Sequence, residues 1–194
     1  ALSEASDGAG AGRSVVFGVI LGTGVGGGIV VDGKVLTGAN AIGGEWGHNP
    51  LPRPNASEWP GPDCYCGRKG CIEAWLSGPA FAAQFAALTG HDREPAEIAQ
   101  LAANGDEAAE AAFTVYENRL GRALATVVNV VDPDVIVLGG GLSNIERLYA
   151  HVPEILSASC FSDGVDTPIV KARHGDSSGV RGAAWLWREE EAFT

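Results

Sequence analysis

The stretch Val15–Leu36, VVFGVILGTGVGGGIVVDGKVL, contains the residues that decide the fold. An apolar, β-branched run at 15–21 is followed by a glycine-rich segment at 22–28, and a second such run leads into the turn Asp32-Gly33. Runs of this composition that are bounded by turn residues are typical of consecutive antiparallel strands. The stretch therefore predicts a β-hairpin or β-meander with a glycine-rich first turn.

The glycine-rich segment allows two interpretations. It is not a Walker motif, because no Lys-Ser or Lys-Thr pair follows the last glycine. Residues 22–27 fit the pattern G-x-G-x-x-G, but a strand follows where a dinucleotide-binding fingerprint needs a helix. Successive backbone N–H groups in such a turn can bind an anion, and the Thr23 hydroxyl adds a donor. Taken alone, the segment fits a phosphate-binding turn or a plain glycine-rich hairpin.

Downstream of the hairpin, three cysteines lie within eight residues, at Cys64, Cys66 and Cys71. His48 precedes the first of them by sixteen residues and completes a set of three thiols and one imidazole. This set is the usual make-up of a structural zinc site. A disulfide or redox arrangement is the alternative, but it would leave one of the three cysteines over, because Cys160 lies far away in the sequence. The cluster therefore predicts bound zinc.

Two glutamates flank the predicted zinc ligands. Glu45 precedes His48 by three residues, and Glu73 follows Cys71 by two. A metal ion with four protein ligands has no open position for water, so it would fix the surrounding loops rather than perform chemistry. Carboxylates held beside an imidazole suit a neutral ligand rich in hydroxyl groups, such as a sugar. We expect Glu45, His48 and Glu73 to bind substrate; the alternative is that both glutamates are solvated loop residues.

The composition limits the classes of partner. The chain has 194 residues, 45% of them hydrophobic, which is enough for one sizeable core. No apolar run reaches the roughly 18 residues that a membrane helix needs. The formal net charge of −11 argues against a nucleic-acid-binding surface. An anionic ligand such as ATP would then need backbone N–H groups and Mg²⁺ beside it. We expect small-molecule partners, no nucleic acid, no membrane and a cytoplasmic protein.

The rest of the chain alternates helical and strand patterns. Apolar spacing and cap residues predict helices and strands in the order of an α/β protein. The expected helices are 74–88 with an interruption near Gly78-Pro79, 94–103, 106–131, 144–158 and 179–187, and the expected further strands are 135–138 and 167–172.

Several motifs together resemble the ROK family of repressors and sugar kinases. They are Gly22–Gly28, Gly44–His48, Cys64–Glu73, Asn129–Ser143 and Gly175–Ala184. The resemblance runs from residue 1 to about residue 187, and its Cys/His/Glu portion is the most specific. The segment 47–52, the proline-rich spacer and Cys64-Tyr-Cys66 look most like bacterial fructokinases of the manno(fructo)kinase type.

The resemblance implies a fold and a function. The fold would be the large lobe of an actin-like, ribonuclease H-like ATPase, a mixed sheet with helices on both faces. The function would be phosphorylation of a hexose hydroxyl by ATP and Mg²⁺, with fructose the first choice and N-acetylglucosamine kinase or glucokinase the alternatives. Family members are often dimers, so we expect a homodimer. The implied nucleotide-binding residues are Gly22, Thr23, Gly24, Val25, Gly26, Gly27, Gly28, Gly140 and Gly141.

The resemblance also implies that parts of a kinase are missing. Kinases of this family begin with Asp-x-Gly-Gly-Thr and carry their catalytic aspartate in Asn-Asp-x-Asn, just before a helix that resembles 1–10. We therefore expect residues 1–194 to be the C-terminal lobe of a longer kinase, with the general base upstream of Ala1. Asp7 is not assigned that role. ROK repressors share this lobe and differ by an N-terminal helix-turn-helix, so a sugar-responsive repressor stays the alternative from another class.

Overall fold

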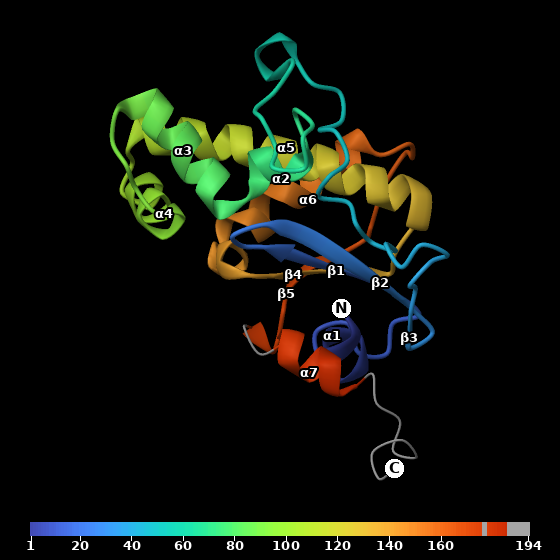
Figure 1. Ribbon diagram of the computed structural model, residues 1–194. Coiled ribbons are helices and arrows are strands. Elements are labelled where there is room, and N and C mark those ends of the chain that lie inside the picture. The colour runs from blue at the N-terminus through green and yellow to red at the C-terminus, as the bar shows by residue number, and fades with distance from the viewer. Residues whose placement is uncertain (176–177, 186–194) are drawn as a thin grey trace.

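The computed structural model describes residues 1–175 and 178–185 and contains one mixed five-stranded sheet in the order β3-β2-β1-β4-β5 (Figure 1). β1, β2 and β3 form the antiparallel meander that the sequence predicted, and β4 and β5 add parallel to β1. The strands are β1 Val15–Leu21, β2 Val25–Val31, β3 Lys34–Val35, β4 Val135–Gly139 and β5 Ile169–Lys171.

Helices cover both faces of the sheet, as expected. In Figure 1, α1 and α7 lie on one side of the sheet and the remaining helices lie on the other. The helices are α1 Leu2–Asp7, α2 Ile72–Leu76, α3 Gly78–Thr89, α4 Pro95–Ala103, α5 Glu107–Val131, α6 Arg147–Ser159 and α7 Ser178–Ala184, with short 3-10 turns at Ala56–Glu58 and Gly141–Asn144. None of the described helices is long and apolar enough to span a membrane.

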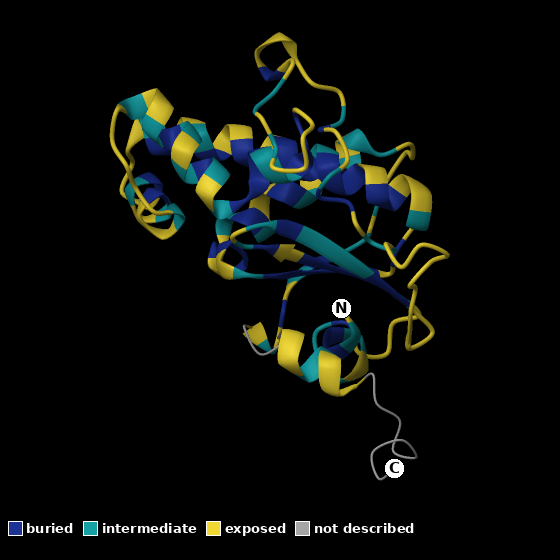
Figure 2. Ribbon diagram, viewed as in Figure 1, coloured by how far each residue is buried: buried dark blue, intermediate teal, exposed yellow. Residues whose placement is uncertain are grey.

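Side-chain alternation along β1 supplies a core on each face. Phe17, Val19 and Leu21 are buried against the large helical layer, whereas Val16 packs in the smaller cluster on the α1 side. Such alternation follows from the two-residue period of a strand. The large core includes buried side chains along most of α5, and Figure 2 shows dark blue segments of this helix alternating with exposed ones. A fully buried side chain such as Phe17 contributes roughly 1.5–3 kcal/mol to stability.

Several predicted elements differ in their bounds. β2 begins at Val25, so Gly26, Gly27 and Gly28 pair with β1 within the strand instead of forming the predicted turn, and α1 ends at Asp7 rather than at residue 10. The helix expected at 74–88 is two helices, because Ser77 leaves the helical conformation and caps α3 by accepting a hydrogen bond from the N–H of Ala80 at 3.3 Å. α6 begins at Arg147 rather than at residue 144, since 141–144 form a 3-10 turn. The last strand is shorter than 167–172. The end of the expected helix 179–187 lies outside the described residues.

Candidate functional site

The predicted zinc ligands converge on one point. The ligand atoms of His48, Cys64, Cys66 and Cys71 all lie within 4.8 Å of one another. The Nδ1 atom of His48 is 3.6 Å from the sulfur of Cys64, and the sulfurs of Cys66 and Cys71 are also 3.6 Å apart. Tetrahedral zinc with Zn–S bonds of about 2.3 Å places neighbouring ligands roughly 3.5–3.8 Å apart. Two of the ligand distances match this spacing, and the cluster is therefore a candidate metal site.

All four cysteines of the chain are free thiols, and no disulfide forms within the cluster. Burial raises the pKa of the Cys71 thiol to about 12, and its thiol neighbours add to this shift. A neutral thiol is a poor metal ligand, because the thiolate is the form that binds. The pKa of Cys66 in the same cluster is instead lowered, first of all by a hydrogen bond from the backbone of Arg68.

Backbone hydrogen bonds hold the ligands in place. Isolated bridges pair Pro50 with Cys71 and Asp63 with Lys69, and the N–H of Cys64 donates to the carbonyl of Arg68 at 2.8 Å. The turn inside the cluster passes through Gly67 and Gly70, whose φ angles are 85° and 69°. Only glycine adopts such angles without strain, so the sequence of the turn itself brings the cysteines together.

A buried ion cluster anchors the proline-rich spacer between His48 and Cys64. The Glu58 carboxylate accepts hydrogen bonds from Arg119 and Arg122 of α5, both at 2.8 Å. Arg119 also lies over the ring of Trp75, 4.0 Å from its centroid. Burial alone would raise the pKa of Glu58, but the hydrogen bonds from Arg119, the Asn55 N–H and Arg122 hold this pKa below its usual value.

Glu73 lies beside the cluster at the first turn of α2. Its carboxylate accepts a hydrogen bond from the N–H of Val25 at 2.8 Å, which joins the cluster to the glycine-rich turn. A Cβ atom at Gly24 would lie 2.6 Å from the same carboxylate oxygen, so this approach requires glycine. The N–H of Val25 is committed to Glu73 in this conformation, although we had expected Val25 to help bind phosphate.

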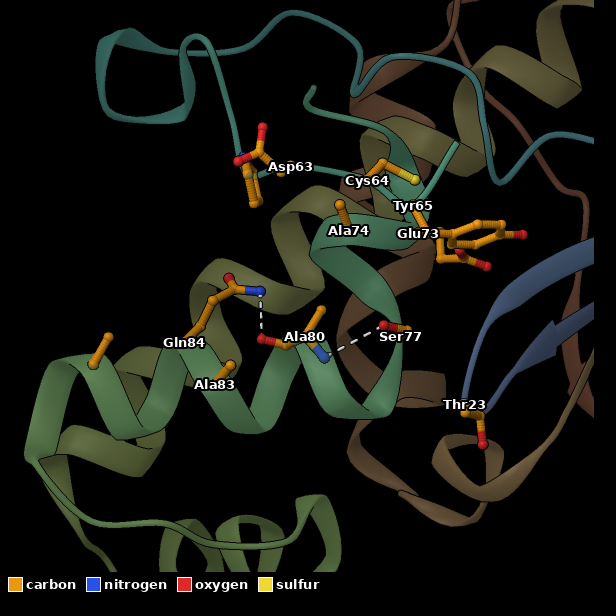
Figure 3. Close-up of a pocket in the computed structure, with 12 residues that line it drawn as sticks. Thr23, Asp63, Cys64, Tyr65, Glu73, Ala74, Ser77, Ala80, Ala83 and Gln84 are labelled. Carbon is orange, nitrogen blue, oxygen red and sulfur yellow. Dashed lines mark hydrogen bonds between the residues drawn. The ribbon is translucent and has the colours of Figure 1, made fainter. Parts of the chain in front are cut away.

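Glu73 and Thr23 line a cavity of about 460 Å³ between the cysteine loop and α3, which we call the α3 groove (Figure 3). Tyr65, which the sequence analysis did not single out, lies at the Glu73 end of this groove. Its hydroxyl is 2.9 Å from the Nε2 atom of His48. The negative charge of Glu73, followed by burial, nearby thiols and Glu45, raises the pKa of Tyr65.

Glu45 lines a different cavity, of about 280 Å³, on the α1 side of the sheet; we call it the sheet cavity. This cavity exists because small residues occupy that face: Gly18, Gly28 and Gly139 line it, together with Ala1. A Cβ atom at Gly18 would lie 2.7 Å from the Cα of Ala1, so Ala1, the N-cap of α1, packs directly on the sheet. The structure thus places the two glutamates on two neighbouring hollows rather than in one.

The predicted nucleotide-binding glycines also lie in different cavities. Gly22, Thr23 and Gly141 line a cavity of about 470 Å³, the turn cavity, which is closed on its other side by the start of α4. Gly26, Gly27 and Gly28 line the sheet cavity instead. At Gly140 φ is 83° and an added Cβ would lie 2.5 Å from the carbonyl oxygen of Leu21, so this residue lets β4 end against β1.

Other residues in or near these cavities lacked a sequence signal. Pro95 and Ala96 of α4 line the turn cavity, but the sequence marked them only as a helix start. Asp7, at the end of α1, pairs with the Nε2 atom of His174 at 2.8 Å and with Arg181 of α7. Both partners belong to the C-terminal part of the chain, so Asp7 links that part to α1.

Comparison with known proteins places the chain in a family. The model of the ROK family matches residues 1–190. An N-acetyl-D-glucosamine kinase of Photobacterium profundum is 42% identical over 193 residues, which are 96% of this chain and 63% of that protein. The chain thus spans less than two thirds of the length of this curated relative.

Two solved structures share the fold. A ROK family glucokinase from Streptomyces griseus, solved in complex with glucose and AMPPNP, matches with a TM-score of 0.82 and 28% identity over 97% of this chain and 65% of that one. A ROK family transcriptional regulator, a homologue of the E. coli MLC protein, matches with a TM-score of 0.80 and 26% identity over 95% of this chain and 48% of that one. These matches confirm the expected actin-like ATPase lobe, and the chain belongs to the ROK family.

Proposed function

We propose that this chain is the C-terminal lobe of an ATP-dependent hexose kinase whose substrate is N-acetyl-D-glucosamine. The observation that carries the proposal is the 42% identity to a protein named N-acetyl-D-glucosamine kinase. Fructose was our first expectation from the spacer and Cys64-Tyr-Cys66. The relatives give it no support, so the alternative substrate takes its place.

The positions of the cavities support separate binding sites for the sugar and for the nucleotide. Glu45 and Glu73 carry acceptor oxygens that suit sugar hydroxyls. The turn cavity, with Gly22, Thr23 and Gly141, is the proposed nucleotide site, and Mg²⁺ would neutralise charge on the transferring phosphoryl group. Ala1 lines the sheet cavity beside Glu45, so the upstream lobe that we propose would join the chain at this cavity. This placement supports a general base upstream of Ala1.

We further propose that the cluster of His48 and three cysteines holds structural zinc. The donor set and its spacing fit that ion. Zinc would fix the loop that carries Tyr65 and the start of α2, which carries Glu73, and it would take no part in the phosphoryl transfer itself.

The test is a coupled ADP-release assay on the full-length protein with N-acetylglucosamine, glucose, mannose and fructose. We expect the highest kcat/KM with N-acetylglucosamine. A highest value with fructose would restore the fructokinase assignment. Turnover of none of the four sugars, together with sugar-dependent binding to DNA upstream of its own gene, would favour the repressor.

A further inference from the structure

Tyr65 is an exposed aromatic residue in an unusual place. It lies between the cluster residues Cys64 and Cys66, and 84% of its surface is accessible. Its ring meets the His48 ring edge to face, with the centroids 5.1 Å apart, and its hydroxyl is 2.9 Å from the Nε2 atom of His48. The phenol is therefore held in one position at the Glu73 end of the α3 groove (Figure 3).

The direction of the bond between His48 and Tyr65 follows from the other ring nitrogen. Nδ1 faces the sulfur of Cys64 at 3.6 Å, and in the proposed zinc site it binds the metal ion. A neutral imidazole that binds a metal ion through Nδ1 carries its proton on Nε2. Nε2–H must then donate to the phenol oxygen of Tyr65. The O–H of Tyr65 is left to donate to a ligand in the groove.

This donor complements the carboxylate beside it. Glu73 only accepts hydrogen bonds, so it suits hydroxyl groups and cannot bind a carbonyl oxygen. Two other polar side chains of the groove already have protein partners. The Gln84 amide donates to the carbonyls of Trp75 and Ala80, and Asp63 pairs with Lys69. A ligand that presents hydroxyl groups and one amide carbonyl matches Glu73 and Tyr65 together.

Along α3 the groove is lined mainly by alanines, and the amide of Gln84 between them already donates to protein carbonyls. Ala80, Ala83 and Ala87 line it along one side of α3, and its volume is about 460 Å³. Such a surface has room for an alkyl chain, and the alanine methyl groups can contact this chain without needing hydrogen bonds from it. The groove is continuous with Glu73, so a sugar bound by this carboxylate can extend a substituent into it.

We propose that Tyr65 and the α3 groove bind the acylamino substituent of a 2-acylamino hexose, with the phenol O–H donating to the amide carbonyl and the acyl chain lying over the alanines of α3. This inference rests on the proposed hexose kinase function and makes it more specific. Tyr65 is then the residue that distinguishes acylamino sugars from plain hexoses, and acyl groups longer than acetyl are accepted.

The first test is Tyr65→Phe in the full-length protein, with N-acetylglucosamine and glucose binding measured by calorimetry without ATP. Loss of one hydrogen bond corresponds to roughly a tenfold weaker Kd for N-acetylglucosamine, while the Kd for glucose changes less than about twofold. Zinc content is measured in parallel and should be unchanged. An equal loss for both sugars would mean that Tyr65 only positions His48, and no loss for either would also overturn the inference.

The second test uses glucosamine with N-acetyl, N-propionyl and N-butyryl groups as substrates. We expect kcat/KM to fall less than about threefold along this series, since the groove has room for the added methylenes. Ala83→Leu fills the groove and should lower kcat/KM for the butyryl sugar at least tenfold relative to glucose. Ala111→Leu, on the exposed side of α5, is the matched control and should leave the ratio unchanged.

The two proposals fail differently. A full-length protein that binds and phosphorylates no hexose contradicts the proposed function. A protein that phosphorylates N-acetylglucosamine, but whose preference is unaffected by Tyr65→Phe and whose acyl series is unaffected by Ala83→Leu, contradicts only the assignment of the groove.

Discussion

At the scale of single residues, the two ring nitrogens of His48 have separate partners. Nδ1 points to the cysteine sulfurs and Nε2 to the Tyr65 hydroxyl. We had expected this side chain both to bind metal and to bind substrate. The geometry assigns Nδ1 to the cluster, while Nε2 reaches the groove through Tyr65. The histidine therefore links the candidate metal site to the candidate sugar site through one ring.

Replacing Cys66 with Ser is expected to remove the metal and to lower Tm, because the free energy of metal binding is part of the free energy of folding. Elemental analysis of the purified wild-type protein should give about one zinc per chain. Cys160→Ser is the control: this thiol lies outside the cluster, so the variant should keep its zinc. Metal-free wild-type protein with the same Tm as the metallated form would refute a structural role.

Replacing Glu45 with Ala in the full-length protein is expected to raise KM for the sugar and leave KM for ATP nearly unchanged. Each hydrogen bond to a charged group that is lost costs about 1.5–3 kcal/mol. Steady-state kinetics with both substrates varied gives the comparison. The exposed Glu154 of α6, replaced with Ala, is the control for removal of one negative charge. If KM and kcat for the sugar stay at wild-type values, Glu45 is a solvated loop residue.

At the scale of elements, the long helix α5 is the support of the site. Its inner face forms much of the large core, while Arg119 and Arg122 reach across to the carboxylate of Glu58 in the spacer. Arg122 also donates to the carbonyls of Pro52 and Arg53. The spacer that connects the cluster residues His48 and Cys64 is thus fixed by charge–charge contacts rather than by secondary structure.

Glu58→Gln is expected to destabilise the protein by about 3 kcal/mol, because two largely buried guanidinium groups lose their counter-charge. Chemical denaturation at pH 7 measures this difference. Glu146→Gln removes an exposed ion pair with Lys171 and should cost less than about 1 kcal/mol. Equally small losses of stability in both variants would show that the buried ion cluster does not contribute to the free energy of unfolding.

The same variant tests a pH dependence. The folded-state pKa of Glu58 lies below its ordinary value of 4.5, so its stabilisation is present above that pH and is lost as the pH falls through the lowered value. The wild type should therefore lose stability more steeply than Glu58→Gln below about pH 4.5. Parallel slopes in acid unfolding would contradict this.

At the scale of the whole molecule, the three cavities surround the end of β1 and the glycine-rich turn that follows it. The α3 groove and the turn cavity share Thr23, and the sheet cavity lies on the opposite face of the sheet. Phosphoryl transfer needs the base, the hydroxyl and the γ-phosphate aligned within hydrogen-bonding reach. The described residues supply the proposed sugar and phosphate contacts, and the proposed base belongs to a preceding segment.

The 194-residue chain alone is therefore expected not to phosphorylate sugar, whereas the protein with its upstream lobe does. Without that lobe the proposed base is missing and closure cannot exclude water. A coupled ADP-release assay with N-acetylglucosamine on both proteins measures the difference, and circular dichroism checks that the short chain is folded. Sugar-dependent turnover by the short chain would place the base within residues 1–194.

The sequence by itself determined the features that depend on local chemistry. The β1–β2 hairpin, the cap and extent of α5, and the set of His48 and three cysteines all follow from patterns within short segments. Turn glycines, helix caps and ligand spacing act over a few residues, so no tertiary information was needed. The predicted bounds were wrong at Ser77, which could continue one helix or cap the next, and at Gly26–Gly28, whose strand conformation depends on pairing with β1.

Only the tertiary structure decided how the functional groups are distributed in space. It separated Glu45 from Glu73 on two cavities, committed the N–H of Val25 to Glu73, and brought Tyr65 to His48. It also divided the glycine-rich segment between the turn cavity and the sheet cavity. These placements depend on which face of the sheet each residue occupies and on helices that pack from far along the chain. A sequence pattern lists the side chains near a site, but packing between distant segments decides which of them share a cavity.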